Sequence, residues 1–192
     1  MTADTITKPH FGSFTIERKL KHSAARVFRA FEDPEAHYRG FVSGEGWEIA
    51  SYTHDFRVGG YEHGNFRPIG HPVMFSNDTW YLEITRGQRI AVAYTMGADG
   101  KPISHSLAVT EFFPDGPNGC RLVYTEQGAY YGGEEDVTNR RGGCAELFGN
   151  LDHAQAGHTE YACCVLLDTC APQAWQQCVD VAGNAQPARS PR

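Results

Sequence analysis

Aromatic and histidine side chains on strand-like stretches are the best candidates for chemistry in this chain. They are Tyr61, His63, Trp80, Tyr94, His105 and Tyr124. Tyrosine and histidine act as general acids and bases, so inside a cavity they could polarise a carbonyl group or move a proton, as a cyclase requires. Ordinary core aromatics, each with one satisfied hydroxyl or ring nitrogen, would give the same pattern. We prefer this second interpretation and assign no catalytic residue.

The nine histidines raise the question of a metal site. No two of them lie three or four residues apart on an expected helix, and the H-E-x-x-H motif is absent. His54, His63 and His71 fall on different expected elements, and His153 and His158 are too far apart for one helical face. We therefore interpret the histidines as surface or turn residues, and we expect no metal and no cofactor.

Charged residues near the C-terminal part of the chain have simple structural explanations. The acidic run at residues 134–136 precedes an expected helix, whose macrodipole stabilises nearby carboxylates by ~0.3–1 kcal/mol. Arg140 and Arg141 form too short a basic run for a phosphate site, so we assign them to a solvated helix face.

The six cysteines give neither a zinc motif nor a disulfide framework. Cys120 and Cys144 are isolated, and the other four crowd together at positions 163, 164, 170 and 178. None of them forms a C-x-x-C pair, and neither isolated cysteine has an evident histidine partner. We expect reduced thiols, with buried cysteine acting as a small hydrophobic residue.

The elements that must position these side chains follow a specific order. Alternation, turn residues and helical spacing predict a strand at 14–20, short helices at 23–31 and 35–41, a strand meander over 46–130 and a long helix over 134–155. Ser23 is the expected N-cap of the first helix, on which Val27, Phe28 and Phe31 form the apolar stripe. This order predicts one antiparallel sheet rather than βαβ units.

A curved sheet that packs against the long helix can leave a cavity between them. Strand alternation assigns one set of residues to the inward faces: Trp80, Leu82, Ile84, Ile90, Val92, Tyr94, Leu122 and Tyr124. Ligand pockets are concave and mainly apolar with few polar groups, which is what this arrangement offers. The expected cavity wall consists of Phe41, Trp47, Tyr61, His63, Trp80, Tyr94, His105, Tyr124 and Phe148.

Length and charge limit the remaining classes of function. The 192 residues suffice for one sizeable core, and the formal net charge of −6 argues against a nucleic-acid-binding face. No stretch approaches the ~18 uninterrupted apolar residues of a membrane span. The N-terminal residues lack the apolar segment of a signal peptide, so we expect a cytoplasmic protein.

Several short motifs resemble one protein superfamily. They occupy residues 14–18, 25–35, 57–60, 81–84, 88–90, 120–122, 126–129 and 150–151. Their order and spacing resemble the START-like, or SRPBCC, superfamily, and within it proteins similar to the C-terminal domain of the activator of the heat-shock-protein-90 ATPase. The resemblance runs from Ser13 to Gln155. It implies an α+β helix-grip fold: a curved antiparallel sheet around a long C-terminal helix, with two short helices after the first strand.

The resemblance implies a cavity but no catalytic signature. We expect a loose leader at 1–12, the helix-grip domain at 13–155 and a cysteine-rich, poorly ordered extension at 156–192. Our first hypothesis is a non-enzymatic domain that binds a small apolar ligand. One alternative is a cyclase-, aromatase- or hydrolase-like enzyme that uses the same cavity. The other is a co-chaperone-like module with a protein partner or a homodimer interface.

Overall fold

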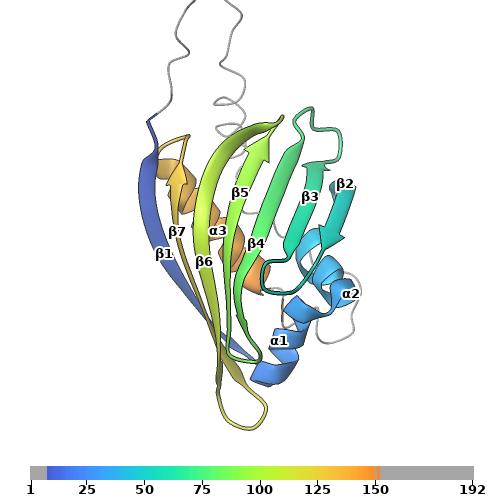
Figure 1. Ribbon diagram of the computed structural model, residues 1–192, viewed down its shortest axis with the longest axis vertical. Helices are drawn as coiled ribbons and strands as arrows, with labels where there is room; N and C mark the ends of the chain where they lie inside the picture. The colour runs from blue at the N-terminus through green and yellow to red at the C-terminus, as the bar shows by residue number, and fades with distance from the viewer. Residues whose placement is uncertain (1–7, 150, 152–192) are drawn as a thin grey trace, which may run out of the picture.

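The computed structural model describes residues 8–149 and 151, which form one curved antiparallel sheet with a long helix behind it (Figure 1). The chain order is β1 (His10–Leu20), α1 (Ala24–Glu32), α2 (Pro34–His37), the π-helical turn η1 (Tyr38–Val42), β2 (Trp47–His54), β3 (Tyr61–Pro68), β4 (Phe75–Thr85), β5 (Arg89–Ala98), β6 (Lys101–Pro114), β7 (Cys120–Tyr130) and α3 (Glu134–Gly149). The expected α+β helix-grip architecture is confirmed.

The sheet has seven strands in the order β1-β7-β6-β5-β4-β3-β2. All neighbours are antiparallel, so β2 to β7 form the expected meander and β1 returns to pair with β7. Strand β1 begins earlier than expected, because β7 extends to Tyr130 and offers His10 a partner. Residues 10–12 therefore belong to the sheet and not to a leader. On the edge strand β2, the register shifts between Ile49 and Ser51, which leaves Ala50 as a bulge.

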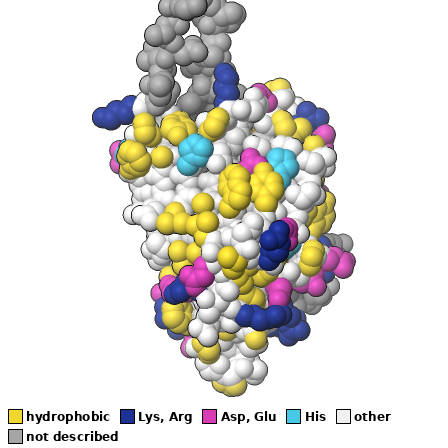
Figure 2. Space-filling view, in the orientation of Figure 1, with side chains coloured by type: hydrophobic (Ala, Val, Ile, Leu, Met, Phe, Trp, Pro, Cys, Tyr) yellow, Lys and Arg dark blue, Asp and Glu magenta, His cyan; other side chains and the backbone are white. Residues whose placement is uncertain are grey.

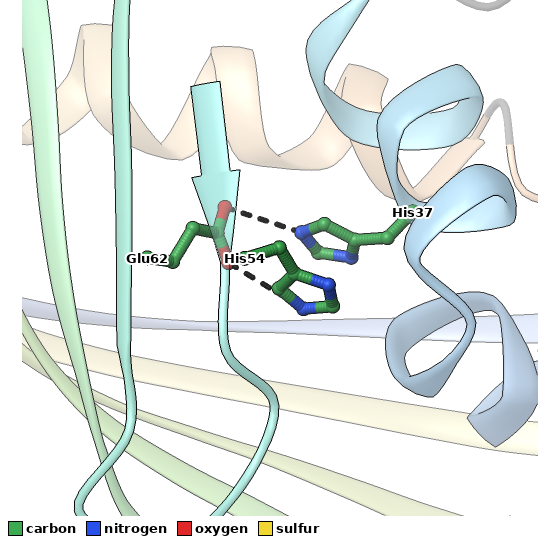
Figure 3. Close-up of side chains that lie close together, drawn as sticks. All are labelled: His37, His54 and Glu62. Atoms are coloured by element: carbon green, nitrogen blue, oxygen red, sulfur yellow. Dashed lines mark hydrogen bonds and ion pairs between the residues drawn. The ribbon is translucent and has the colours of Figure 1, made fainter.

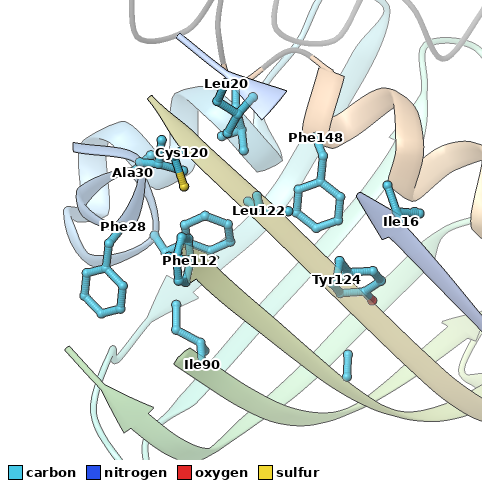
Figure 4. Close-up of a cluster of buried hydrophobic side chains, with 14 of the residues drawn as sticks. Ile16, Leu20, Phe28, Ala30, Ile90, Phe112, Cys120, Leu122, Tyr124 and Phe148 are labelled. Carbon is cyan, nitrogen blue, oxygen red and sulfur yellow. The ribbon is translucent and has the colours of Figure 1, made fainter. Parts of the chain in front are cut away.

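The main core lies where α1 packs against the sheet (Figure 4). Val27, Phe28 and Phe31 of α1 are buried, as their helical spacing predicted. The rings of Phe28 and Phe31 meet Phe112 of β6 edge-on, with centroids 5.3 and 5.2 Å apart. Ser23 occupies the N-cap position, but its side chain makes no capping hydrogen bond. Aromatic packing, rather than the cap, holds this helix on the sheet.

The face predicted for part of β4 is wrong. Trp80 and Leu82 are 45% and 52% exposed, whereas Thr79 and Tyr81 are buried. The register shifts between Tyr81 and Glu83, so Leu82 is an extra residue in the ladder. After this bulge the alternation is reversed, and Ile84 packs against the core. Apolar residues on both faces of β4 make its sequence alternation ambiguous.

Helix α3 packs against β1 and β7. A Cβ atom added to Gly12 of β1 would lie 2.7 Å from Val137 Cγ2, so glycine allows the close approach of helix and sheet. A Cβ atom added to Gly142 of the helix would meet nothing within 4 Å, so the close contact depends on the glycine of the strand. The expected extension at 156–192 lies outside the described residues. No helix in the described part of the chain is long and apolar enough to cross a membrane.

Candidate functional site

A cavity of about 410 Å³ lies between the sheet, the α2–η1 segment and α3. Its wall is mostly apolar. Aromatic rings come from Phe31, Phe41, Trp47, Phe66, Phe75 and Phe148, and aliphatic groups from Ile90, Val92, Met96, Ile103 and Leu147. Polar side chains enter the wall in two groups: one around Arg140 of α3 and one around Glu62 of β3. The apolar wall with these few polar groups has the usual composition of a small-molecule site.

The structure places the nine expected wall residues on two different faces. The cavity is lined by Phe41, Trp47, Tyr94, Tyr124 and Phe148. The other four, Tyr61, His63, Trp80 and His105, do not line it. Residues directly opposite in an antiparallel ladder share a face. The row Tyr61–Trp80–Ala93 and the row His63–Asp78–Thr95–His105 therefore lie on the outer face of the sheet.

The outer face carries a mixed patch of its own. The ring of Tyr61 contacts that of Trp80 at a tilt of 47°, with ring centroids 5.1 Å apart, and His63 Nδ1 lies 2.7 Å from Asp78 Oδ1. Tyr61 also donates its hydroxyl proton to Asp78. Figure 2 shows hydrophobic, histidine and acidic side chains gathered on this face. The expectation that these residues line the cavity is corrected, because inward and outward positions of β3 and β4 both carry aromatic residues.

Arg140 belongs to the cavity wall and not to a solvated helix face. Its side chain is 17% exposed. It donates from Nη1 to the Tyr94 hydroxyl at 2.8 Å and from Nη2 to Ser104 Oγ at 2.9 Å. Burial lowers the pKa of Arg140, but the Tyr94 hydroxyl and Glu126 outweigh this effect and raise it above its ordinary value. The guanidinium is therefore a fixed positive charge in the wall.

Glu126 of β7 is the counterion of Arg140, with Oε1 3.9 Å from Nη1. It is fully buried, and three hydroxyl groups donate to it: Ser106 at 2.7 Å, Tyr124 at 2.6 Å and Tyr130 at 2.9 Å. We call Glu126, Arg140 and these hydroxyl partners the arginine cluster. A sequence signal for Arg140 existed, because it stands four residues before Cys144 and seven before Leu147, on the apolar stripe of the helix.

A second cluster joins the ends of three elements (Figure 3). His37 ends α2, His54 ends β2, and Glu62 stands next to the first residue of β3. His54 and Glu62 are ladder partners and so share the inner face. His37 Nε2 lies 3.2 Å from Glu62 Oε1, and His54 Nε2 lies 3.9 Å from Oε2. The two imidazole rings stack in parallel, 4.5 Å apart with 4° between their planes.

We call His37, His54, Glu62 and Tyr81 the histidine cluster. The hydrogen bonds of Tyr81 determine which ring nitrogens carry a proton. Its hydroxyl donates to Glu62 Oε2 at 2.6 Å and lies 3.1 Å from His54 Nε2. Because the Tyr81 hydroxyl already donates its hydrogen bond to Glu62, it can only accept from His54. His54 Nε2 must therefore carry a proton and donate to the Tyr81 oxygen. His37 Nε2 faces a carboxylate that can only accept, so it also carries a proton. When the rings are neutral, neither Nδ1 atom carries a proton, so both can only accept a hydrogen bond.

Burial governs the electrostatics of the histidine cluster. Burial and the neighbouring His37 lower the pKa of His54, which keeps its ring neutral at physiological pH. Burial raises the pKa of Glu62, but its contacts with His37, Tyr81 and His54 outweigh this and lower it, so the carboxylate is ionised. Burial and the charge of Glu62 raise the pKa of Tyr81, which stays protonated.

Three buried polar atoms of this region have no hydrogen-bond partner among the described residues. They are His37 Nδ1, His54 Nδ1 and the Tyr52 hydroxyl. The side chains of His37 and His54 are only 9% and 2% exposed, so their interpretation as surface or turn residues is wrong. Sequence spacing could not reveal the pair, because it forms only when the α2–η1 segment folds over the end of β2. Chemically, the cluster offers imidazole nitrogens and a carboxylate beside the cavity.

Comparison with protein families gives a match over most of the described chain. The family model for Activator of Hsp90 ATPase homolog 1-like protein matches residues 21–155. No curated protein matches this chain.

Solved structures include two similar proteins from rhizobia. The Mll3558 protein from Rhizobium loti is 36% identical, and the match covers 77% of this chain and 99% of that one, with a TM-score of 0.70. A putative uncharacterized protein from Rhizobium leguminosarum is 32% identical over 80% of this chain and 100% of that one, with a TM-score of 0.72. The AHSA1-like protein from Aeromonas hydrophila, at 17% identity, 78% and 96% coverage and a TM-score of 0.58, shares the fold.

Proposed function

We propose that this chain, which belongs to the family of Activator of Hsp90 ATPase homolog 1-like proteins, binds one small, mainly apolar molecule in the cavity between the sheet and α3. The observation that carries the proposal is the cavity itself. Its volume of about 410 Å³ falls within the range of small-molecule sites, and its wall is mainly aromatic and aliphatic.

The polar groups of the wall limit which molecules fit. At one place Arg140 donates hydrogen bonds to Tyr94 and Ser104, and at another place stands Glu62 with its histidines. A ligand with an apolar body and one or two hydroxyl or carbonyl groups would match both polar places. A fully apolar ligand would fill the cavity but leave these groups without an additional partner.

A direct test is titration with the fluorescent apolar probe N-phenyl-1-naphthylamine. Val92 lines the cavity, so Val92→Trp should fill part of it and weaken probe binding at least tenfold. Val58→Trp introduces the same side chain at a position that is 57% exposed, and we expect unchanged binding. Equal binding by both variants, or no binding by the wild type, would contradict the proposal. Native mass spectrometry of protein purified from its own cells would then identify a retained ligand.

A second candidate is a hydrolase- or cyclase-like reaction in the same cavity. The observation in its favour is that Glu62 contacts two imidazoles beside the cavity, which resembles the pairing of a base with an orienting carboxylate. Turnover of aryl esters by the wild type and its loss in Glu62→Gln, with probe binding retained, would decide for this candidate. A protein partner or homodimer on the outer face, and a cytoplasmic location, stay predictions.

A further inference from the structure

We propose that His37, His54 and Glu62 form a binding site for a divalent transition-metal ion, with Zn²⁺ as the first candidate. These three residues bring two imidazole nitrogens and a carboxylate oxygen within 4.8 Å of one another. Two histidines and one carboxylate are a ligand set that Zn²⁺ accepts when one coordination position stays open. Figure 3 shows that the three side chains converge from separate elements.

The ligand atoms already lie close together. With metal–ligand bonds of about 2.0–2.1 Å, tetrahedral geometry places neighbouring ligand atoms about 3.3 Å apart. His37 Nε2 is 3.2 Å from Glu62 Oε1, and His54 Nε2 is 3.9 Å from the other oxygen, Oε2. The ion would therefore contact both oxygens, or the carboxylate would turn to offer one oxygen to both histidines. The parallel imidazole planes must tilt toward each other, because both nitrogen lone pairs have to point at one ion. Rotation about χ2 of histidine has a broad energy profile and permits this tilt.

The charge of the site also favours a cation. Among the described residues, Glu62 pairs only with the two histidines and has no contact with a lysine or an arginine. A divalent ion would give this poorly hydrated carboxylate a cationic partner. Tyr81 would keep its hydrogen bond to Oε2 and hold the carboxylate in place, as outer partners of metal ligands do.

The unpartnered ring atoms set the expected strength of binding. A histidine that binds metal through Nε2 carries its proton on Nδ1, and neither Nδ1 has an acceptor among the described residues. Missing outer partners weaken metal affinity by roughly 10–100-fold, so we expect micromolar rather than nanomolar binding. The open position would face the cavity and take water or an oxygen atom of the bound molecule. Only the binding of that molecule to the metal ion rests on the proposed function.

The experiment is Zn²⁺ titration of the full chain by isothermal calorimetry. Cysteine thiolates also bind zinc, so every protein in the series carries Cys→Ser substitutions at positions 163, 164, 170 and 178. We expect one ion per chain, and at least tenfold weaker binding in His54→Gln and in Glu62→Gln. His63→Gln is the matched control, because His63 pairs with a single carboxylate on the outer face. Equal affinity in all four proteins, or no uptake at all, would overturn the site.

A second measurement uses the protein in which all histidines and Glu62 are unchanged. Histidine ring ¹⁵N resonances should move on Zn²⁺ addition for His37 and His54 and stay in place for His63, and the opposite pattern would refute the site even if zinc binds. Circular dichroism of each metal-free variant verifies that it folds. Probe titration with and without Zn²⁺ separates the two proposals: probe binding without zinc uptake refutes only the metal site, and zinc uptake without probe binding refutes only the ligand site.

Discussion

Each of the two polar clusters beside the cavity contains one carboxylate with little exposure to solvent, but the partners of the two carboxylates differ. In the arginine cluster, Glu126 accepts hydrogen bonds from three hydroxyl groups and faces the permanent charge of Arg140. In the histidine cluster, Glu62 accepts one hydroxyl hydrogen bond, from Tyr81, and otherwise faces two imidazoles. The first carboxylate has a permanently charged counterion, and the second has only histidine partners, whose charge depends on protonation.

This difference separates a carboxylate whose partners are all in place from one whose histidine partners still have free ring atoms. The hydroxyl groups of Ser106, Tyr124 and Tyr130 already donate to Glu126. A new partner of this carboxylate would have to displace one of these hydrogen bonds. The histidine cluster leaves His37 Nδ1, His54 Nδ1 and the Tyr52 hydroxyl without partners among the described residues. Unsatisfied polar atoms in a buried position are unusual in native proteins and are often explained by an ion or a water molecule.

The largest effect should come from breaking the arginine cluster. Arg140→Met leaves Glu126 buried without its counterion, and removal of one partner of a buried ion pair costs about 3 kcal/mol or more. We expect the free energy of unfolding, measured with urea, to fall by about this amount. Arg141→Met is the matched control, because Arg141 is exposed on the same helix and should change stability by less than about 0.5 kcal/mol. Equal effects of the two substitutions would mean that Arg140 is not structural.

A smaller effect is expected in the histidine cluster. Glu62→Gln removes the charge and one acceptor but leaves no permanently charged partner such as arginine behind, so the free energy of unfolding should fall by only about 1 kcal/mol in metal-free protein. Glu48→Gln, which removes an exposed ion pair with Arg67, serves as the control and should cost less. If Glu62→Gln destabilised the protein as strongly as Arg140→Met, the two clusters would not differ as we argue.

The smallest effect concerns the thiol at the border of the arginine cluster. Burial and the charge of Glu126 raise the pKa of Cys144 to about 12, from an ordinary value near 9. The folded state therefore keeps its proton between these values while the unfolded state loses it, so this group lowers stability as the pH rises from about 9 to 12. At pH 8, iodoacetamide should modify Cys144 far more slowly in folded than in urea-unfolded protein, as read by peptide mass spectrometry. Equal rates would show that the thiol is accessible.

Much of the fold could be predicted because it depends on local patterns. The apolar stripe of α1 and the turns of the meander are encoded in neighbouring residues, and the family motifs have the same order as the strands. The face of β4 could not be predicted, because a single extra residue, Leu82, reverses the alternation. The site depended on contacts between distant segments. His37 meets Glu62 across 25 positions, and Arg140 meets Tyr94 across 46.

The bulge at Ala50 has a consequence for how molecules of this protein behave toward one another. The sheet is not closed, so β2 is an edge strand with backbone groups that another strand could pair with. An extra residue within an edge strand bends it and interrupts its regular row of donors and acceptors. A strand from a second molecule would find no continuous template there. The bulge therefore protects this edge against sheet extension and aggregation while leaving the inner face free to line the cavity.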